Sequence, residues 1–212
     1  FEVALHKLIQ ETIRDHKRII FNGDGYDESW VKEAEKRGLM NLKATPDALA
    51  HLLDEKNLKL FTEHKVYSQT ELEARFEVLN ENYAKIINIE ALTMLDMAHK
   101  DIMPAMSAYS AELADAALKK ASVDPDIDCV YEKETIKKIN SMITAMSKQT
   151  KKLEEDLLAA KSIEDVAELS MFYKDTVLPD MTALRISGDE MESVASAEKW
   201  PYPSYGELLF GV

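Results

Sequence analysis

The sequence contains few of the residues that build disulfide frameworks or tight catalytic loops. It has one cysteine, six glycines and six prolines among 212 residues. A single cysteine, Cys129, cannot form an internal disulfide, which suits a reducing compartment. No apolar run approaches the ~20 residues of a membrane-spanning helix. Because the N-terminus also has no basic-then-apolar signal pattern, we expect a cytoplasmic chain without membrane contact.

An excess of positive charge is also absent. The chain carries 39 acidic and 26 basic residues, a formal net charge of −13. Nucleic acids and anionic membranes reward a positive face, so both are excluded as expected partners. What the sequence does have is 46% hydrophobic and 31% charged residues. This mixture is typical of amphipathic helices.

The phrase RIIFNGDGYDESW, residues 18–30, holds two of the glycines. Their spacing fits neither glycine-rich phosphate loop, and Asp24 would repel a phosphate. The acidic residues do not alternate as an EF-hand requires. The phrase therefore predicts a turn, with Asp27 capping a helix that begins near Glu28 and stops at Gly38.

Apolar residues recur at helical spacing along the chain. Short helices are expected first, including residues 46–54 and 57–64. The capping box from Ser68 to Glu71 then opens a helix of about 50 residues that Pro104 must bend. A seam follows that alternates steps of three and four, as coiled coils do, at Ile136, Ile139, Ile143, Met146, Thr150, Leu153, Leu157 and Ala160. A last long helix should start at a Ser162 cap, which predicts an all-α fold: short helices, then a long, kinked antiparallel bundle of about three long helices.

One pattern occurs twice. DIMPAMSA at residues 101–108 and TVLPDMTA at residues 176–183 share an aliphatic-x-Pro-x-Met-[Ser/Thr]-Ala sequence. Two similar helix kinks would explain the repeat, and so would a duplicated binding element. Both interpretations stay open at this point.

No catalytic, cofactor-binding or metal-binding residue emerges. Asp96, His99 and the preceding Glu90 hint at a di-metal carboxylate site, but such sites need a second Glu-x-x-His, and residues 134–195 contain no histidine. The five histidines therefore fit surface or core positions better than ligand positions. Cys129 lies in an acidic loop that would raise the pKa of its thiol, which disfavours a nucleophile. The ten methionines fit a helical core better than a promiscuous binding face.

The C-terminal segment is unusually apolar. Free chain ends are commonly polar and frayed, so this composition predicts a docking peptide instead of a disordered end. Prolines 201 and 203 should keep the segment extended. The predicted docking residues are Trp200, Tyr202, Tyr205, Leu208, Leu209 and Phe210.

Three phrases carry a family resemblance: HKRIIFNGDGYDESWVKEAEKRGLMNLKATPDAL at residues 16–49, KIINIEALTMLDMAHKDIMPAM at residues 85–106, and the terminal YPSYGELLFGV. They resemble the C-terminal region of type III glutamine synthetases, the large bacterial form. Residues 45–86 and the final PYPSYGELLFGV are also similar to the end of ordinary glutamine synthetases. The sequence departs from that pattern at Glu207, which follows the Tyr205-Gly206 pair instead of preceding the aromatic residue.

The resemblance implies three parts. Residues 1–89 would be the helical end of a catalytic domain, residues 90–199 a long helical-hairpin insertion, and residues 200–212 an extended apolar docking peptide. The chain starts at Phe1 inside an apparent helix, without an initiator methionine. We therefore expect a piece of a longer protein whose catalytic domain lies upstream.

The resemblance also implies an activity for that longer protein. The family ligates ammonia to glutamate through a γ-glutamyl phosphate, using ATP and Mg²⁺ or Mn²⁺, and assembles as hexameric rings. Its metal-binding and ATP-contacting motifs should precede Phe1, so this chain alone is expected to be inactive and to serve assembly or regulation. The alternative is a free-standing helical adaptor that binds a partner protein.

Overall fold

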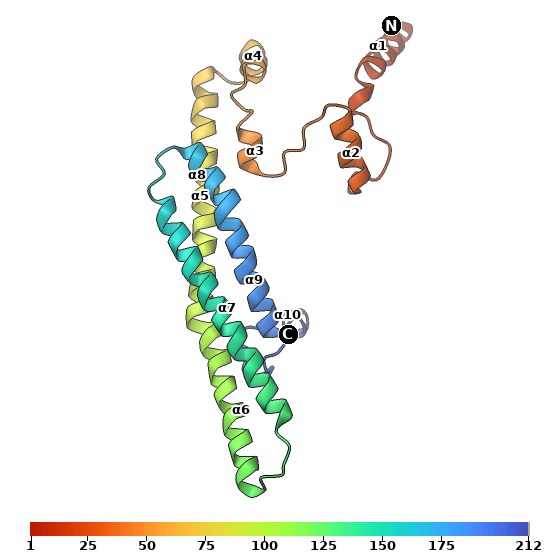
Figure 1. Cartoon of the computed structure of the whole chain (residues 1–212). Coiled ribbons are helices and arrows are strands. Elements are labelled where there is room, and N and C mark those ends of the chain that lie inside the picture. The colour runs from red at the N-terminus through yellow and green to blue at the C-terminus, as the bar shows by residue number, and fades with distance from the viewer. Residues whose placement is uncertain (212) are drawn as a thin grey trace. The chain divides into compact units, whose positions relative to one another are not determined.

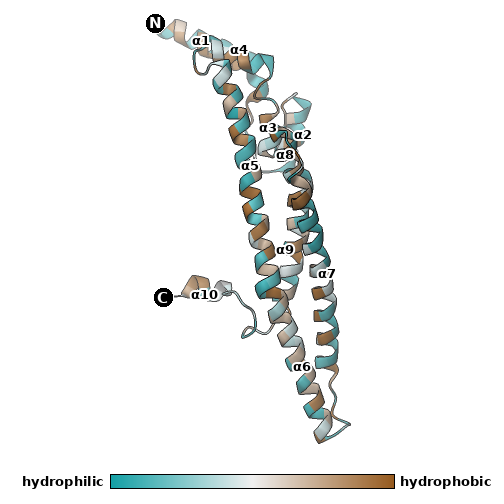
Figure 2. Ribbon diagram, turned by 90° about the vertical axis from the view of Figure 1, so that its left-hand side faces the viewer, coloured by the Kyte–Doolittle hydropathy of each residue, from teal (hydrophilic) through white to brown (hydrophobic). Residues whose placement is uncertain are grey.

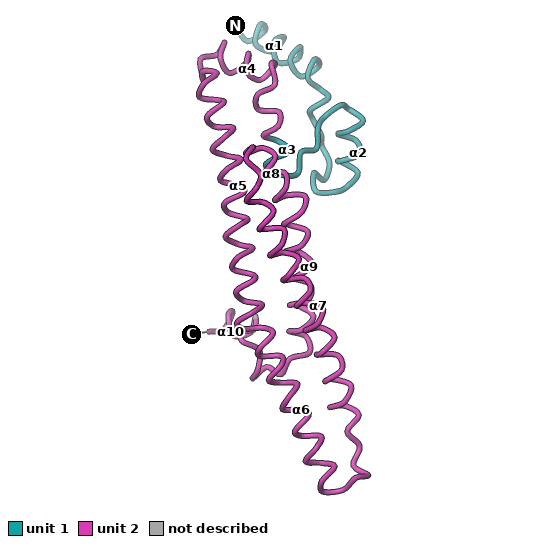
Figure 3. The backbone as a smooth tube through the Cα atoms, turned by 60° about the vertical axis from the view of Figure 1, so that its left-hand side comes forward, with its two compact units in different colours: residues 1–48 teal, residues 49–212 magenta. Residues whose placement is uncertain are grey.

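The computed structural model describes residues 1–211, apart from the side chain of Tyr205. Within that range the chain forms helices joined by loops, with no β-strand, which confirms the predicted all-α class (Figure 1). No helix among these residues is both long enough and apolar enough to cross a membrane. The chain divides into two compact units, residues 1–48 and residues 49–212 (Figure 3). The further division expected at residues 89 and 199 stays a prediction.

The smaller unit holds α1 (Glu2–Asp15), the 3₁₀ turn η1 (Lys17–Ile19), α2 (Glu28–Lys36) and most of α3 (Thr45–Leu49). The predicted turn before α2 is confirmed. Asp24 accepts a hydrogen bond from the Tyr26 N–H at 2.9 Å, and Asp27 caps α2 by accepting from the Ser29 N–H at 2.7 Å. Gly38 follows the helix with φ of +75°, a conformation that glycine adopts without strain.

The larger unit is the predicted antiparallel bundle. Its elements are α4 (Glu55–Glu63), α5 (Gln69–Met97), η2 (Ala98–Ile102), α6 (Met103–Val123), α7 (Val130–Ala160), α8 (Val166–Phe172), η3 (Tyr173–Val177), α9 (Leu178–Glu192) and α10 (Tyr205–Phe210). The elements α5, η2 and α6 join into one helix of 55 residues, and α8, η3 and α9 into one of 27. In Figure 1 the first joined helix runs down, α7 returns beside it, and the second joined helix runs down again against α5 and α7.

Each joined helix contains the same irregular turn. The elements η2 and η3 are π-helical turns in which a backbone N–H reaches five residues back, from Met103 to Ala98 and from Leu178 to Tyr173. A proline stands two residues after each turn, at positions 104 and 179. Because proline has no N–H to donate, the row of backbone hydrogen bonds along the helix is interrupted at the proline. The helix accommodates this with one wider turn that holds an extra residue, and it continues beyond the proline. The two repeats therefore share one local structure.

The predicted seam of α7 forms the centre of the core. All of its positions are buried or half-buried, and Ile139, Met146, Thr150 and Leu153 are at most 1% exposed. They pack against buried residues of α5, α6 and α9 in one continuous cluster. The seam prediction is confirmed.

Two polar contacts fix how the joined helices align. Ser170 on α8 donates its hydroxyl hydrogen bond to the side-chain carbonyl of Asn80 on α5 at 2.6 Å. One helical turn further along the second joined helix, the Tyr173 hydroxyl donates to the side-chain carbonyl of Asn88 on α5 at 3.0 Å. A sliding of either helix would leave these buried groups without partners, which costs about 1–3 kcal/mol for each group.

The cap of the last joined helix differs from the expectation. Ser162 does not cap it; its hydroxyl donates to the Ala159 carbonyl at the end of α7 at 2.7 Å. Asp165 is the cap, accepting from the N–H groups of Ala167 and Glu168 at 3.0 and 2.8 Å. A carboxylate at this position accepts two backbone bonds and also favours the positive end of the helix dipole.

The seam gives a direct test of the core. We expect Leu153→Ala to lower the free energy of unfolding by about 2–5 kcal/mol, because Leu153 is fully buried and the variant leaves a cavity. Leu158→Ala is the matched control, since Leu158 lies on the same helix but is 67% exposed, and its effect should stay within about 0.5 kcal/mol. Urea titration followed by circular dichroism measures both. Equal losses would contradict the assignment of the core.

Candidate functional site

The segment after α9 is anchored on the bundle by its first residues. Trp200 and Tyr202 pack against the core cluster and meet edge to face, with ring centroids 6.1 Å apart. The Tyr202 hydroxyl donates to Asp101 at 2.8 Å, and the Lys199 ammonium pairs with Glu112 at 2.6 Å. Of the six predicted docking residues, these two aromatic side chains do dock, within the same unit of the same chain.

The remainder of the segment corrects the expectation of an extended peptide. Residues 205–210 form the short helix α10. Ser204 and Glu207 make a capping box, in which the Ser204 hydroxyl accepts from the Glu207 N–H at 3.3 Å and the Glu207 carboxylate accepts from the Ser204 N–H at 2.6 Å. These bonds lower the pKa of Glu207. The prolines precede the helix and restrict only the residues before it.

Large apolar side chains of α10 are exposed to solvent. Leu208, Leu209 and Phe210 are 65%, 73% and 81% exposed, and the helix is among the most hydrophobic parts of Figure 2. The Tyr205 side chain lies outside the described residues. Of the predicted docking set, Trp200 and Tyr202 thus pack on the bundle, whereas Leu208, Leu209 and Phe210 are largely exposed. Docking on a partner stays a prediction.

A groove of about 570 Å³ lies where this segment crosses the bundle. We call it the methionine groove because the side chains of Met94, Met97, Met146 and Met181 line it. Both repeated proline motifs border it, through Ala98 and Ile102 of η2 and through the first turns of α9. Gly188 leaves room in the wall, since a Cβ there would lie 3.9 Å from the side chains of Ile102 and Met146. The remaining lining residues are Leu178, Thr182, Leu184, Arg185, Asp189, Glu192, Trp200, Tyr202, Pro203 and Leu208.

The charged groups of the groove stand at its edge. Arg185 pairs with Asp189 one turn further on α9 at 2.6 Å, while Glu192 is exposed and makes no ion pair within residues 1–211. Burial and the bond to Asp101 raise the pKa of Tyr202 to about 12. The hydroxyl therefore stays a donor below pH 10, and its contribution to holding the segment is lost as the pH rises toward 12.

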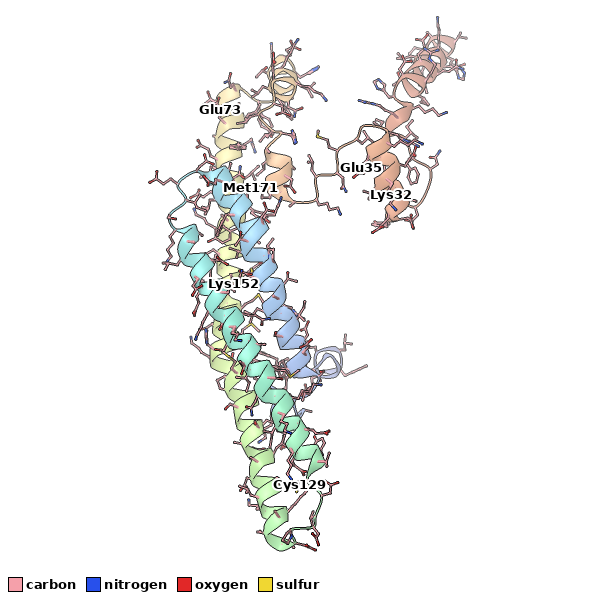
Figure 4. The ribbon with its side chains drawn as sticks, viewed as in Figure 1. Lys32, Glu35, Glu73, Cys129, Lys152 and Met171 are labelled. Atoms are coloured by element: carbon pink, nitrogen blue, oxygen red, sulfur yellow. The ribbon has the colours of Figure 1, made fainter. Side chains whose placement is uncertain are left out.

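The candidate metal and nucleophile residues do not assemble into a reactive site. His99 faces Glu154 of α7 at 3.1 Å, and Asp96 pairs with Lys100. In the described part of the chain, no group of three or more His, Cys, Asp or Glu side chains is placed to hold a metal ion. Cys129 is buried at the turn from α6 to α7, labelled in Figure 4, and its thiol points to the Ile127 carbonyl at 3.6 Å.

A cluster of charged side chains between α7 and α9 was not predicted from the sequence. Lys152 of α7, labelled in Figure 4, reaches Asp180 of α9 at 2.6 Å and Asp156 at 3.1 Å. Burial and a hydrogen bond with Asp156 raise the pKa of Asp180, while the same bond lowers the pKa of Asp156. The contacts of Lys152 with the two carboxyl groups tie α7 to α9. This is a structural contact.

The groove itself was missed because the methionines were assigned to the core. Met146 and Met181 are indeed buried, but Met94 and Met97 are only half-buried. The available signal was their clustering around the repeated proline motifs. An apolar, flexible lining of this volume can bind apolar groups, and it presents no group suited to bond-making chemistry.

The anchor of the segment can be tested by hydrogen exchange. Tyr202→Phe removes the donor to Asp101 and should cost about 1 kcal/mol of docking, which corresponds to about fivefold faster exchange of the backbone amides after residue 199. Tyr26→Phe is the control, because that side chain is fully exposed and its hydroxyl makes no such contact. Unchanged exchange in Tyr202→Phe would show that the hydroxyl does not hold the segment.

Comparisons with known proteins identify the family of this chain. A family model described as the glutamine synthetase C-terminal domain matches residues 4–121. A glutamine synthetase of Butyrivibrio fibrisolvens is 38% identical over 97% of this chain. A type-3 glutamine synthetase of Dictyostelium discoideum is 33% identical over 99%, and a glutamine synthetase of Bacteroides fragilis (strain YCH46) is 30% identical over 98%.

The extent of these matches also matters. The chain spans about 29% of the length of each of these relatives, in their C-terminal part. The expected resemblance is therefore confirmed. The chain belongs to the glutamine synthetase family, as the C-terminal domain of a type III member.

Proposed function

We propose that this chain is the assembly part of an ATP-dependent glutamate–ammonia ligase, which makes glutamine in nitrogen assimilation. The observation that carries the proposal is the match of nearly the whole chain to glutamine synthetases of which it spans only 29%. Under this proposal ATP and Mg²⁺ or Mn²⁺ bind in the remaining part of the protein, which also supplies the catalytic residues. A free-standing adaptor is less favoured, because the relatives contain this segment within a longer chain.

An exposed apolar surface on α5 supports the assembly role. We define the α5 face by its large apolar side chains, each between 43% and 63% exposed: Val78, Leu79, Ile86, Ile89 and Leu92. They recur over four turns of a helix whose opposite side is buried in the bundle. Fully burying such a side chain stabilises by about 1.5–3 kcal/mol, so a helix that leaves five of them in water is suited to a further partner.

The smaller unit has a comparable surface. On α1 an apolar stripe is exposed along the whole helix, at Leu5, Leu8, Ile9 and Ile13, and α1 has no buried residue. An amphipathic helix of 14 residues gains most of its stability from packing its apolar side. We propose that both surfaces pack on the upstream catalytic domain or on neighbouring subunits of a homo-oligomer, and that the enzyme resides in the cytoplasm.

The activity is tested by comparing two proteins. The full-length protein should form glutamine from glutamate, ammonia and ATP in the presence of Mg²⁺ or Mn²⁺, as measured by γ-glutamyl transfer and by phosphate release. The purified 212-residue chain should show neither activity, because under this proposal the residues that bind ATP and metal lie in the remaining part of the protein. Metal-dependent turnover by the chain alone would refute the division of labour, and inactivity of the full-length protein would refute the ligase assignment.

The assembly role is tested on the α5 face. In the full-length protein, Ile89→Asp should lower the assembled fraction in light scattering and the melting temperature, since a carboxylate would be buried at the interface at a cost of several kcal/mol. Leu158→Asp is the matched control: Leu158 has a similar exposure, at 67% against 63%, but lies near the opposite end of α7 from that helix's other large exposed apolar residues, Val130 and Tyr131. Equal behaviour of the two variants would leave the α5 face without a role in assembly.

A further inference from the structure

The methionine groove has the lining of a site for an amphipathic helix. Thioether side chains are flexible and polarisable, so a methionine-rich surface can adapt to apolar side chains of different shape. Met94 and Met97 lie one helical turn apart on α5, and Met181 faces them from α9. Grooves of this kind accept a helix that inserts apolar residues spaced three and four apart.

The backbone around the groove supports the same conclusion. The π-helical turn η2 borders it through Ala98 and Ile102, and α9 borders it from Leu178, the first residue after η3. Such turns occur frequently at functional sites. From the C-terminal segment, Trp200, Tyr202, Pro203 and Leu208 line the groove, while Leu209 and Phe210 are largely exposed. The described side chains of this segment therefore cover the groove in part and do not fill it.

The charged residues at the edge of the groove indicate that its partner is positively charged. At the edge of the groove Arg185 is engaged with Asp189, and Glu192 adds a negative charge that has no counter-ion in the described residues. Asp101 accepts the hydroxyl hydrogen bond of Tyr202, which lines the groove. Most of the chain's net charge of −13 also lies in residues 49–212. A cationic partner would be attracted at long range and fixed in orientation at the edge.

We propose that the methionine groove binds an amphipathic helix of a partner protein, with apolar anchors on one face and basic residues flanking them. The anchors occupy the space between α5 and α9, and the basic residues face Glu192 at the edge of the groove. This site is independent of the ligase activity proposed above, because its lining belongs to the bundle and the C-terminal segment alone.

The probe is a fluorescein-labelled peptide of leucine and lysine, with the leucines on one helical face. Fluorescence anisotropy with the full-length protein should show saturable binding of one peptide per chain. A peptide with glutamate in place of lysine should not bind. A peptide of residues 204–211 should bind more weakly than the leucine–lysine peptide, since it represents the chain's own apolar helix.

Two matched pairs of variants locate the site. Glu192→Lys should weaken binding about fivefold, whereas Glu134→Lys, the same charge change at an exposed position of α7, should not. Leu208→Ser, at the groove, should weaken binding by a similar factor, whereas Leu118→Ser, an exposed leucine of α6, should not. All four positions are exposed, so the variants should fold.

Each alternative result overturns the proposal. Equal weakening by Glu192→Lys and Glu134→Lys would mean non-specific attraction to an acidic surface. Preference for the 204–211 peptide would mean that the groove serves a second copy of this chain's C-terminal segment. Absence of saturable binding by the leucine–lysine peptide would exclude a basic helix as the occupant. None of these results would bear on glutamine formation, so the two proposals can fail separately.

Discussion

The apolar seam of α7 is the interaction on which the bundle depends. Successive turns of this one helix are shielded by α6 on one side and by α9 on the other, so a single row of side chains couples both neighbours. Hydrophobic burial is non-directional and stabilises any arrangement that hides the row. The seam therefore accounts for why the three long helices associate, while their alignment requires contacts of another kind.

Polar contacts supply that alignment. Asn80 and Ser170 are almost fully buried and satisfy each other, and Lys152 of α7 holds Asp180 of α9. A misaligned bundle would bury the same groups without partners, so alternatives that keep the seam are still disfavoured. Near the Lys152–Asp180 contact, where α9 follows η3, the helices leave the methionine groove between them. The groove therefore depends on how the helices are aligned as well as on the side chains that line it.

Much of the fold could be predicted from local sequence, because caps and helical periodicity act over a few residues. The capping box at Ser68, the cap at Asp27 and the seam of α7 all depend on near neighbours and were confirmed. The second capping box, from Ser204 to Glu207, has the same signature, but the neighbouring prolines favoured an extended interpretation. The groove could not be predicted in this way, because which methionines stay half-covered is decided only when α5 and α9 meet.

The repeated π-helical turns have a consequence for how this domain tolerates change in length. A helix advances about 100° per residue, so one extra residue in an α-helical path rotates everything after it by that angle. Each turn already absorbs one such residue ahead of its proline. Deleting a single residue there would convert the π-helical turn into an ordinary α-helical turn and leave Met106 or Met181 facing the interior, whereas the same deletion elsewhere in these helices would rotate the residues after it by about 100°. In these two stretches, loss of one codon should therefore be tolerated better than in the rest of the same helices.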